Sequence, residues 1–205
     1  MDVTYVRRSL DAAFDLVVRD QRAWSKFDLT TEGFYRSFAA LLICIPLNIV
    51  IDVLLDKAAA AQKLARGKQL LDPAYGIGDA AFATASLGVQ WLIFPIAMIF
   101  LLRFLDLGHR YAALVIAHNW GTVVIWLFNM PAILLYAAGV IAPDTATDIN
   151  FVVLGLTLYY RFYIAQTALG TTWSIAMAIA MIDFLLQVNY LFALSQISGL
   201  WLPAS

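Results

Sequence analysis

Long apolar runs alternate with short polar connections along most of the chain. The runs cover about residues 34–55, 80–105, 111–141, 149–169 and 173–197. A helix rises roughly 1.5 Å per residue, so each run is long enough to cross the roughly 30 Å of hydrocarbon in a bilayer. A backbone in lipid has to close its own hydrogen bonds, which a helix does. The pattern predicts an all-α fold, a polytopic membrane bundle of about five transmembrane helices over residues 34–197.

The first 33 residues have a different pattern. Apolar side chains recur there at helical spacing, and the charged side chains lie mainly on other faces. The apolar stripe consists of Val6, Leu10, Ala13, Phe14, Val17 and Trp24. This predicts an N-terminal amphipathic helix and a linker over residues 1–33, on the cytoplasmic side. The helix is expected either at the membrane interface or packed on the bundle. A short tail, residues 198–205, follows the last run.

Composition strengthens the membrane assignment and limits the chemistry. Hydrophobic residues make up 62% of the chain and charged residues 13%, against roughly 25% charged in an ordinary soluble domain. The 205 residues leave no room for a separate catalytic domain beside five helices. The single cysteine, Cys44, excludes an internal disulfide and a cysteine metal cluster.

The basic residues are unevenly distributed, and this predicts the orientation. Eight Lys and Arg fall on the side of the N-terminus and four on the other side, all of them in the connection 56–79. Positive charge favours the cytoplasm. We therefore expect an integral membrane protein, of a bacterial inner membrane, with a cytoplasmic N-terminus and an exoplasmic C-terminus.

Two charges fall inside apolar runs, at similar distances from the turn at Gly170. Arg161 precedes the turn by nine residues and Asp183 follows Thr172 by eleven, so an antiparallel hairpin brings them to similar depth and lets them pair. His118 and Asn119 are expected near the same depth and complete a candidate polar cluster. An unpaired charge in lipid costs several kcal/mol, about 3 by insertion scales. The pair either fixes the register of the helices or takes part in function, and the sequence leaves both open.

Aromatic residues neighbour Arg161 in the sequence, and prolines occur inside three of the other apolar runs. Tyr159, Tyr160, Phe162 and Tyr163 surround Arg161 in the sequence and are candidates to stack on it. Pro46, Pro95 and Pro131 lie inside three successive runs and predict helix kinks. His109 and His118 are nine residues apart, so they do not share one helix face at metal spacing. No metal, haem or other cofactor is expected.

The layout resembles that of the Yip1-domain family of small membrane proteins. The common features are a cytoplasmic N-terminal segment, five closely spaced spans over about residues 34–197 and a short exoplasmic tail. The stretch ahead of the first span reads DLTTEGFYRSF where the family has an acidic residue followed by Leu-Tyr-Gly-Pro, and no functional residue is carried over. The resemblance implies a non-enzymatic protein concerned with membrane organisation or with partner proteins.

Two functions fit these features best; a membrane enzyme that uses His118, Asp183 and Arg161 is a third, although no known catalytic spacing connects these residues. The first is a non-enzymatic accessory, organising or partner-binding subunit, because no catalytic constellation is visible and the polar groups suit helix packing. The alternative is a small dimeric transporter or channel that uses the intramembrane polar cluster; five spans do not divide into two equal inverted halves. A cavity reaching Arg161 favours transport, and a closed salt bridge favours the accessory function. The expected partners are the lipid bilayer and a protein partner or second copy, and no nucleic acid.

Overall fold

The computed structural model describes residues 2–65, 67 and 75–201, and all regular secondary structure in them is helical. The elements are α1 (Val3–Val17), α2 (Ala23–Lys26), α3 (Thr31–Ser37), α4 (Ala39–Ala65), α5 (Ile77–Phe104), η1 (Gly108–Arg110), α6 (Tyr111–Ala137), α7 (Pro143–Leu169) and α8 (Trp173–Trp201).

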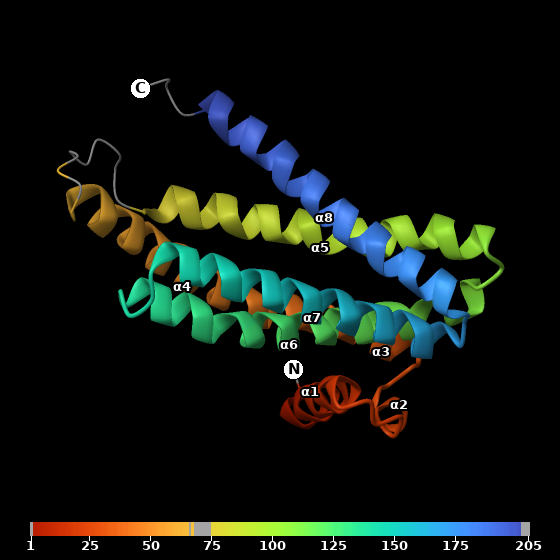
Figure 1. Ribbon diagram of the computed structural model, residues 1–205. Helices are drawn as coiled ribbons and strands as arrows, with labels where there is room; N and C mark the ends of the chain where they lie inside the picture. Colours follow the sequence, from red (N-terminus) through yellow and green to blue (C-terminus); the bar gives the residue numbers. More distant parts are fainter. Residues whose placement is uncertain (1, 66, 68–74, 202–205) are drawn as a thin grey trace.

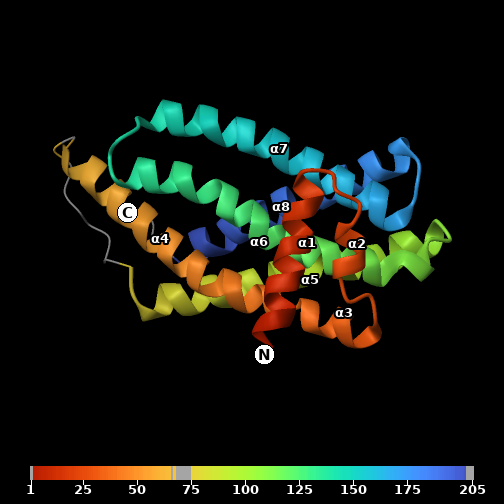
Figure 2. The same cartoon turned by 90° about the horizontal axis from the view of Figure 1, so that it is seen from below.

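The five long helices, α4 to α8, run back and forth along one axis (Figure 1). Helices α6 and α7 lie side by side in both ribbon views, and α8 diverges from α5 towards its C-terminal end (Figures 1 and 2). We call the end that holds α2 and α3 the proximal end. The opposite end, where α4 ends at Ala65 and α5 begins at Ile77, is the distal end.

Within the described residues, four helical stretches are long and apolar enough to cross a membrane. They are Thr31–Leu64, Ile77–Phe104, Gly108–Ala137 and Trp173–Gln196. The expected fifth run, 149–169, lies within α7, which is not among the four. Arg161, neighbouring tyrosines and a polar first turn containing Asp144 lower the hydropathy of α7.

Several helices extend beyond the apolar runs. Helix α4 continues past the apolar run, through the sequence DKAAAAQKLA, and ends at Ala65. Alanine, lysine, glutamine and leucine all have a high helix propensity, so the helix does not require a continuous apolar sequence here. Lys57 and Lys63 of the connection 56–79 therefore lie on α4; Arg66 and Lys68 lie outside the described residues. Helix α7 begins at Pro143, a favourable first helical position for proline. Helix α8 continues through 198–201, while residues 202–205 of the expected tail lie outside the described residues.

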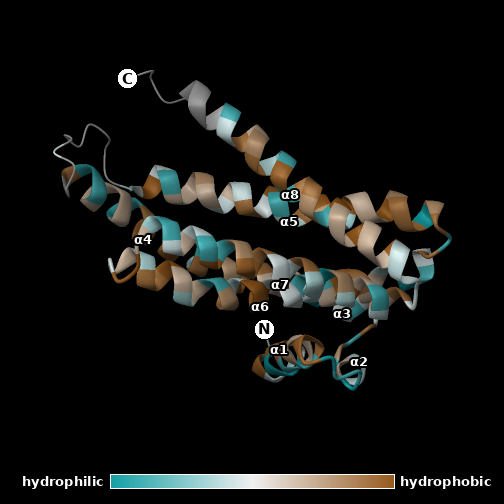
Figure 3. Ribbon diagram, viewed as in Figure 1, coloured by the Kyte–Doolittle hydropathy of each residue, from teal (hydrophilic) through white to brown (hydrophobic). Residues whose placement is uncertain are grey.

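The packed core lies towards the proximal end. In α6 the buried residues are concentrated in the first half, 114–124, and in α7 in the second half, 160–169. The distal halves instead expose large apolar side chains, among them Leu134, Leu135, Phe151, Val152 and Leu156. In the ribbon of Figure 3, hydrophobic residues, coloured brown, recur along these helices. A surface of this composition suits lipid rather than water.

Helix α1 crosses the side of the bundle instead of extending it (Figure 2). It buries Ser9, Ala12, Ala13 and Leu16. The Tyr160 hydroxyl of α7 donates to the Ala13 carbonyl at 2.8 Å. Helix α1 is thus packed on the bundle.

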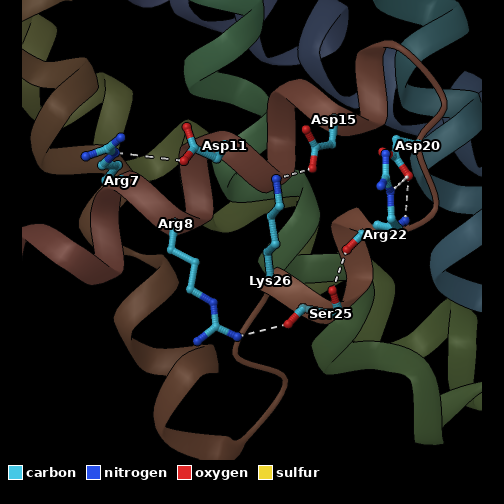
Figure 4. Close-up of polar contacts among 8 residues, drawn as sticks. All are labelled: Arg7, Arg8, Asp11, Asp15, Asp20, Arg22, Ser25 and Lys26. Carbon is cyan, nitrogen blue, oxygen red and sulfur yellow. Dashed lines mark hydrogen bonds and ion pairs between the residues drawn. The ribbon is translucent and has the colours of Figure 1, made fainter.

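Polar contacts join α1 to α2 on the outer side (Figure 4). Lys26 Nζ lies 2.5 Å from Asp15 Oδ2, and the Arg8 guanidinium donates to the Ser25 carbonyl at 2.9 Å. Next, Thr30 caps α3, because its hydroxyl oxygen accepts from the Gly33 backbone N–H at 3.1 Å, as its residue type and position predict. The N-terminal segment is therefore a folded part of the molecule.

Candidate functional site

Asp183 on α8 is the centre of a buried polar cluster. Its Oδ2 atom lies 3.3 Å from Arg161 Nε on α7 and 3.3 Å from His118 Nε2 on α6. Its Oδ1 atom accepts from the Gln187 side chain at 3.2 Å. The exposed fractions of Asp183, Arg161 and His118 are 3%, 6% and 9%. One carboxylate oxygen of Asp183 therefore lies close to two basic side chains, and all three side chains are buried.

The two terminal nitrogens of Arg161 bind α6. Nη1 donates to the His118 carbonyl at 2.9 Å, and Nη2 donates to Thr122 Oγ1 at 2.7 Å. The Thr122 hydroxyl donates in turn to the His118 carbonyl at 2.8 Å. A buried charge is tolerated when it is both paired and hydrogen-bonded. Arg161 has both kinds of partner, and it joins α6, α7 and α8.

Phe94 and Asp183 fix the orientation of the His118 ring, and one ring nitrogen has no hydrogen-bond partner among the described residues. Phe94 of α5 stacks on it, with ring centroids 3.7 Å apart and planes 7° apart. Because an ionised carboxylate only accepts, the hydrogen of a neutral His118 ring is assigned to Nε2, which faces Asp183. Nδ1 then carries the lone pair, and it has no hydrogen-bond partner among the described residues.

The other expected members of the cluster lie elsewhere. The Asn119 amide donates to Ser37 Oγ at 2.9 Å, towards α3, because successive residues on a helix point in directions about 100° apart. Tyr163 donates to the Arg19 carbonyl at 3.2 Å, and the Arg19 guanidinium lies over the rings of Tyr159 and Tyr163. These tyrosines thus contact the arginine of the N-terminal segment.

The prolines lie inside continuous helices. Pro46, Pro95 and Pro131 are interior residues of α4, α5 and α6. The Pro95 carbonyl accepts from the Tyr111 hydroxyl at 3.2 Å. The predicted kinks at the three positions stay predictions.

A cavity of about 100 Å³ reaches the cluster. His118, Arg161 and Asp183 form one part of its wall, and Gln90, Thr122, Thr157 and Gln187 add neutral polar groups. Trp91, Phe94 and Trp126 form an aromatic part of the wall. The Trp91 indole nitrogen is buried and has no hydrogen-bond partner in the described part of the chain. The cluster is thus accessible from an internal space that also offers hydrogen bonds.

A second, larger pocket of about 430 Å³ adjoins this cavity on the distal side, and Leu87 and Gln90 line both. Its wall contains three carboxylates, Asp52, Asp56 and Asp79. Near them the Asn48 side chain donates to Asp52 at 2.8 Å. Across the pocket, the Tyr190 hydroxyl donates to the Ser86 carbonyl at 2.6 Å.

On three of the helices that line the two spaces, the lining residues follow helical stripes. The stripes are 48, 52 and 56 on α4, then 79, 83, 86 and 90 on α5, then 183, 187, 190 and 194 on α8. Spacings of three and four residues put side chains on one helix face. The spacing is visible in the sequence, but the sequence does not reveal that α4, α5 and α8 face one another. Thr122, four residues after His118, is found by the same spacing rule.

The remaining chemistry of the site is limited. No group of three or more His, Cys, Asp or Glu side chains in the described ranges is arranged to hold a metal ion. Cys44 is buried in α4. The carboxylate, imidazole and guanidinium groups provide proton exchange and hydrogen bonding to a small polar solute.

Comparison with known proteins gives no relative: no family model, no curated protein and no solved structure matches the chain. The resemblance to the Yip1-domain family stays a prediction.

Proposed function

We propose that the protein is a small five-span membrane transporter or channel, in which a polar solute or ion moves between the distal face and the Asp183 cluster. The observation that carries the proposal is the cavity of about 100 Å³ that reaches His118, Arg161 and Asp183 and adjoins the acidic distal pocket. A buried pair that served only packing would not need such a space.

Helix α7 is the fifth span in this proposal. Helices α6 and α8 both run from the proximal to the distal end (Figure 1), and both belong to stretches apolar enough to cross a membrane. The chain between them has to return across the same thickness, and α7 is that segment. Its outer face exposes Phe151, Val152 and Leu156, while Arg161 is turned inward.

The position of α1 along the bundle supports a proposed boundary between the headgroup region and the hydrocarbon. Helix α1 contacts α6 through the Tyr5 and Trp120 rings, whose centroids lie 5.8 Å apart. On its outer side the Arg7 side chain is 84% exposed and pairs with Asp11 at 4.0 Å. Exposed charges are unfavourable in hydrocarbon, so we place the headgroup region at the level of α1. The hydrocarbon then lies on the distal side, and the path through the two pockets crosses it.

A second copy of the chain belongs to the proposal. Five helices do not form two equal inverted repeats around a central site, so a symmetric transporter of this size is expected to be a homodimer. Cross-linking in native membranes tests the dimer separately from the path.

Substituted-cysteine labelling and flux together test the function. In a Cys44→Ala background, Ser86→Cys and Gln90→Cys place thiols in the path, and Leu156→Cys places one on the outer face of α7. A membrane-impermeant thiol reagent is expected to modify the first two and leave Leu156→Cys unmodified. The same reagent is expected to block flux of at least one member of a panel (protons, potassium, sodium, chloride, glycerol) from proteoliposomes. Equal, negligible labelling at all three positions, or no flux above empty liposomes, would overturn the proposal in favour of the accessory function.

A further inference from the structure

We propose that His118 is a proton-carrying residue and that protons are the ion, or one of the ions, that this protein moves. The inference rests on the proposed function and names its substrate class. It starts from Nδ1 of His118, a buried basic nitrogen without a hydrogen-bond partner among the described residues, in a side chain that lines the cavity.

The hydrogen bonding of His118 leaves one ring nitrogen that can bind a proton. The hydrogen bond from Nε2 to Asp183 Oδ2, 3.3 Å long, leaves the lone pair on Nδ1. A proton taken from water binds there, and the ring becomes an imidazolium whose positive charge lies next to the carboxylate. Release of the proton to water restores the neutral ring. Covalent bonds to carbon and oxidation states do not change in either step.

Arg161 and His118 compete for the same oxygen of Asp183. When His118 is neutral, the charges of Arg161 and Asp183 cancel. A protonated His118 adds a second cation at 3.3 Å from Oδ2 and weakens the hold of Asp183 on Arg161. Arg161 keeps its bonds to Thr122 and the His118 carbonyl, because neither depends on Asp183. Protonation therefore changes how α8 is held by α7, the kind of coupling that a proton-driven change of conformation needs.

The charged and titratable groups around His118 are few. Asp183 comes from α8 and Arg161 from α7, and Tyr160 of α7 and Cys44 of α4 interact electrostatically with Arg161. The α5 residues that line the cavity are Leu87, Gln90, Trp91, Ile93 and Phe94, and none of them titrates. His118 is the group in this set whose ordinary protonation range includes neutral pH.

The two sides of the cluster differ in access. On the distal side, the cavity adjoins the pocket lined by Asp52, Asp56 and Asp79; negative side chains in a cleft raise the local concentration of cations, protons included. On the proximal side lies a void of about 10 Å³, lined mainly by apolar residues such as Leu114, Ile164 and Ile179. That space holds about one water molecule at most. The larger polar spaces thus lie on the distal side of the cluster.

The test is proton flux into proteoliposomes that contain a pH-sensitive dye, driven by a potassium gradient with valinomycin. We expect His118→Gln to lower the flux at least ten-fold, because glutamine hydrogen-bonds to Asp183 but does not carry a proton at neutral pH. His109→Gln is the matched control, since His109 lies in η1 at the end of α5, and it is expected to keep wild-type flux. Size-exclusion chromatography verifies that both variants fold.

A second measurement needs no variant of His118. The chain contains two histidines, so ¹⁵N-histidine spectra assigned with His109→Gln resolve His118. A hydrogen on Nε2 at high pH and protonation of Nδ1 as the pH falls are expected. Proton flux that is unchanged in His118→Gln, or a His118 ring that never changes its protonation between pH 4 and pH 9, would overturn the inference. Flux of another ion without proton flux would also overturn it and leave the proposed function standing; no flux of any kind would remove both.

Discussion

The hydroxyl of Tyr160 donates a hydrogen bond to the backbone carbonyl of Ala13, 2.8 Å away, and so joins α7 to the N-terminal helix. The contact is buried. We expect Tyr160→Phe to lower the free energy of unfolding by about 1–3 kcal/mol, because the Ala13 carbonyl loses its buried partner. Thermal unfolding in detergent measures the loss. Tyr159→Phe is the control, since Tyr159 is 43% exposed, and an equal loss in both variants would contradict the assignment.

Removing one partner of the central ion pair is expected to be costly. Asp183→Leu leaves the Arg161 charge buried without its carboxylate, and the expected loss of unfolding free energy is about 3–5 kcal/mol. The double variant Arg161→Leu with Asp183→Leu is expected to recover much of this, because no buried charge remains. A double-mutant cycle on folded yield and denaturant unfolding measures the coupling. Strictly additive losses would mean that the two side chains do not depend on each other. If stability returns without flux, the pair is part of the path.

Gly33 is expected to tolerate no side chain. A Cβ atom there would lie 2.0 Å from the Asp28 carbonyl oxygen, so the turn before α3 would have to open. We expect Gly33→Ala to lower the free energy of unfolding by about 1–3 kcal/mol, the usual cost of overpacking. At Gly88, in contrast, nothing lies within 4 Å of the same atom. Gly88→Ala is expected to be neutral or slightly stabilising in its helix. Equal melting temperatures for the two variants would be inconsistent with this turn.

The same turn predicts a pH dependence. The Asp28 side chain accepts from Thr30 Oγ1 at 2.6 Å and from the Thr30 backbone at 3.1 Å, and these bonds hold the pKa of the Asp28 carboxyl below its ordinary value of 3.8. A pKa depressed by folding adds stability above the unfolded value, and this stability disappears as the pH falls through the folded pKa. The gain is expected to be under about 1 kcal/mol, because solvent screens such groups. Wild type is therefore expected to be more stable than Asp28→Asn at pH 6 and equally stable at pH 2; a difference that grows in acid would contradict this.

Fusions test the orientation. The excess of Lys and Arg on the N-terminal side predicts that a fluorescent protein joined before Met1 is cytoplasmic and that alkaline phosphatase joined after Ser205 is active outside. With five spans the two ends lie on opposite sides, and with four they lie on the same side. A phosphatase that is inactive after Ser205, in cells where the N-terminal fusion fluoresces, would therefore point to four spans.

The sequence predicted side-chain contacts where a short connection limits how two helices lie relative to each other. Helices α7 and α8 are joined by the turn at Gly170, whose φ of 60° is favourable for glycine. A connection this short fixes the register of the hairpin, which is why the proximity of Arg161 and Asp183 could be predicted by counting residues. The third partner, His118, followed from its depth in α6.

Contacts between helices that are not neighbours in the chain could not be predicted in this way. Periodicity shows that Gln90 and Gln187 lie on polar stripes of α5 and α8, but not that these stripes face each other. Likewise, the tyrosines near Arg161 contact Arg19, because the side of α7 that faces α1 is set by packing. Hydropathy also counts the charge of Arg161 against α7, although this side chain is buried inside the bundle.

The position of α1 across α6 and α7 has a consequence for how the protein is made. A ribosome synthesises Ala13 early and its partner Tyr160 147 residues later. At about 5–20 residues per second, the two are separated by roughly 7–30 s of translation. During that interval the buried face of α1, with Ala12, Ala13 and Leu16, lacks its contact with α7. Helix α1 therefore completes its native contacts only after α7 has been synthesised.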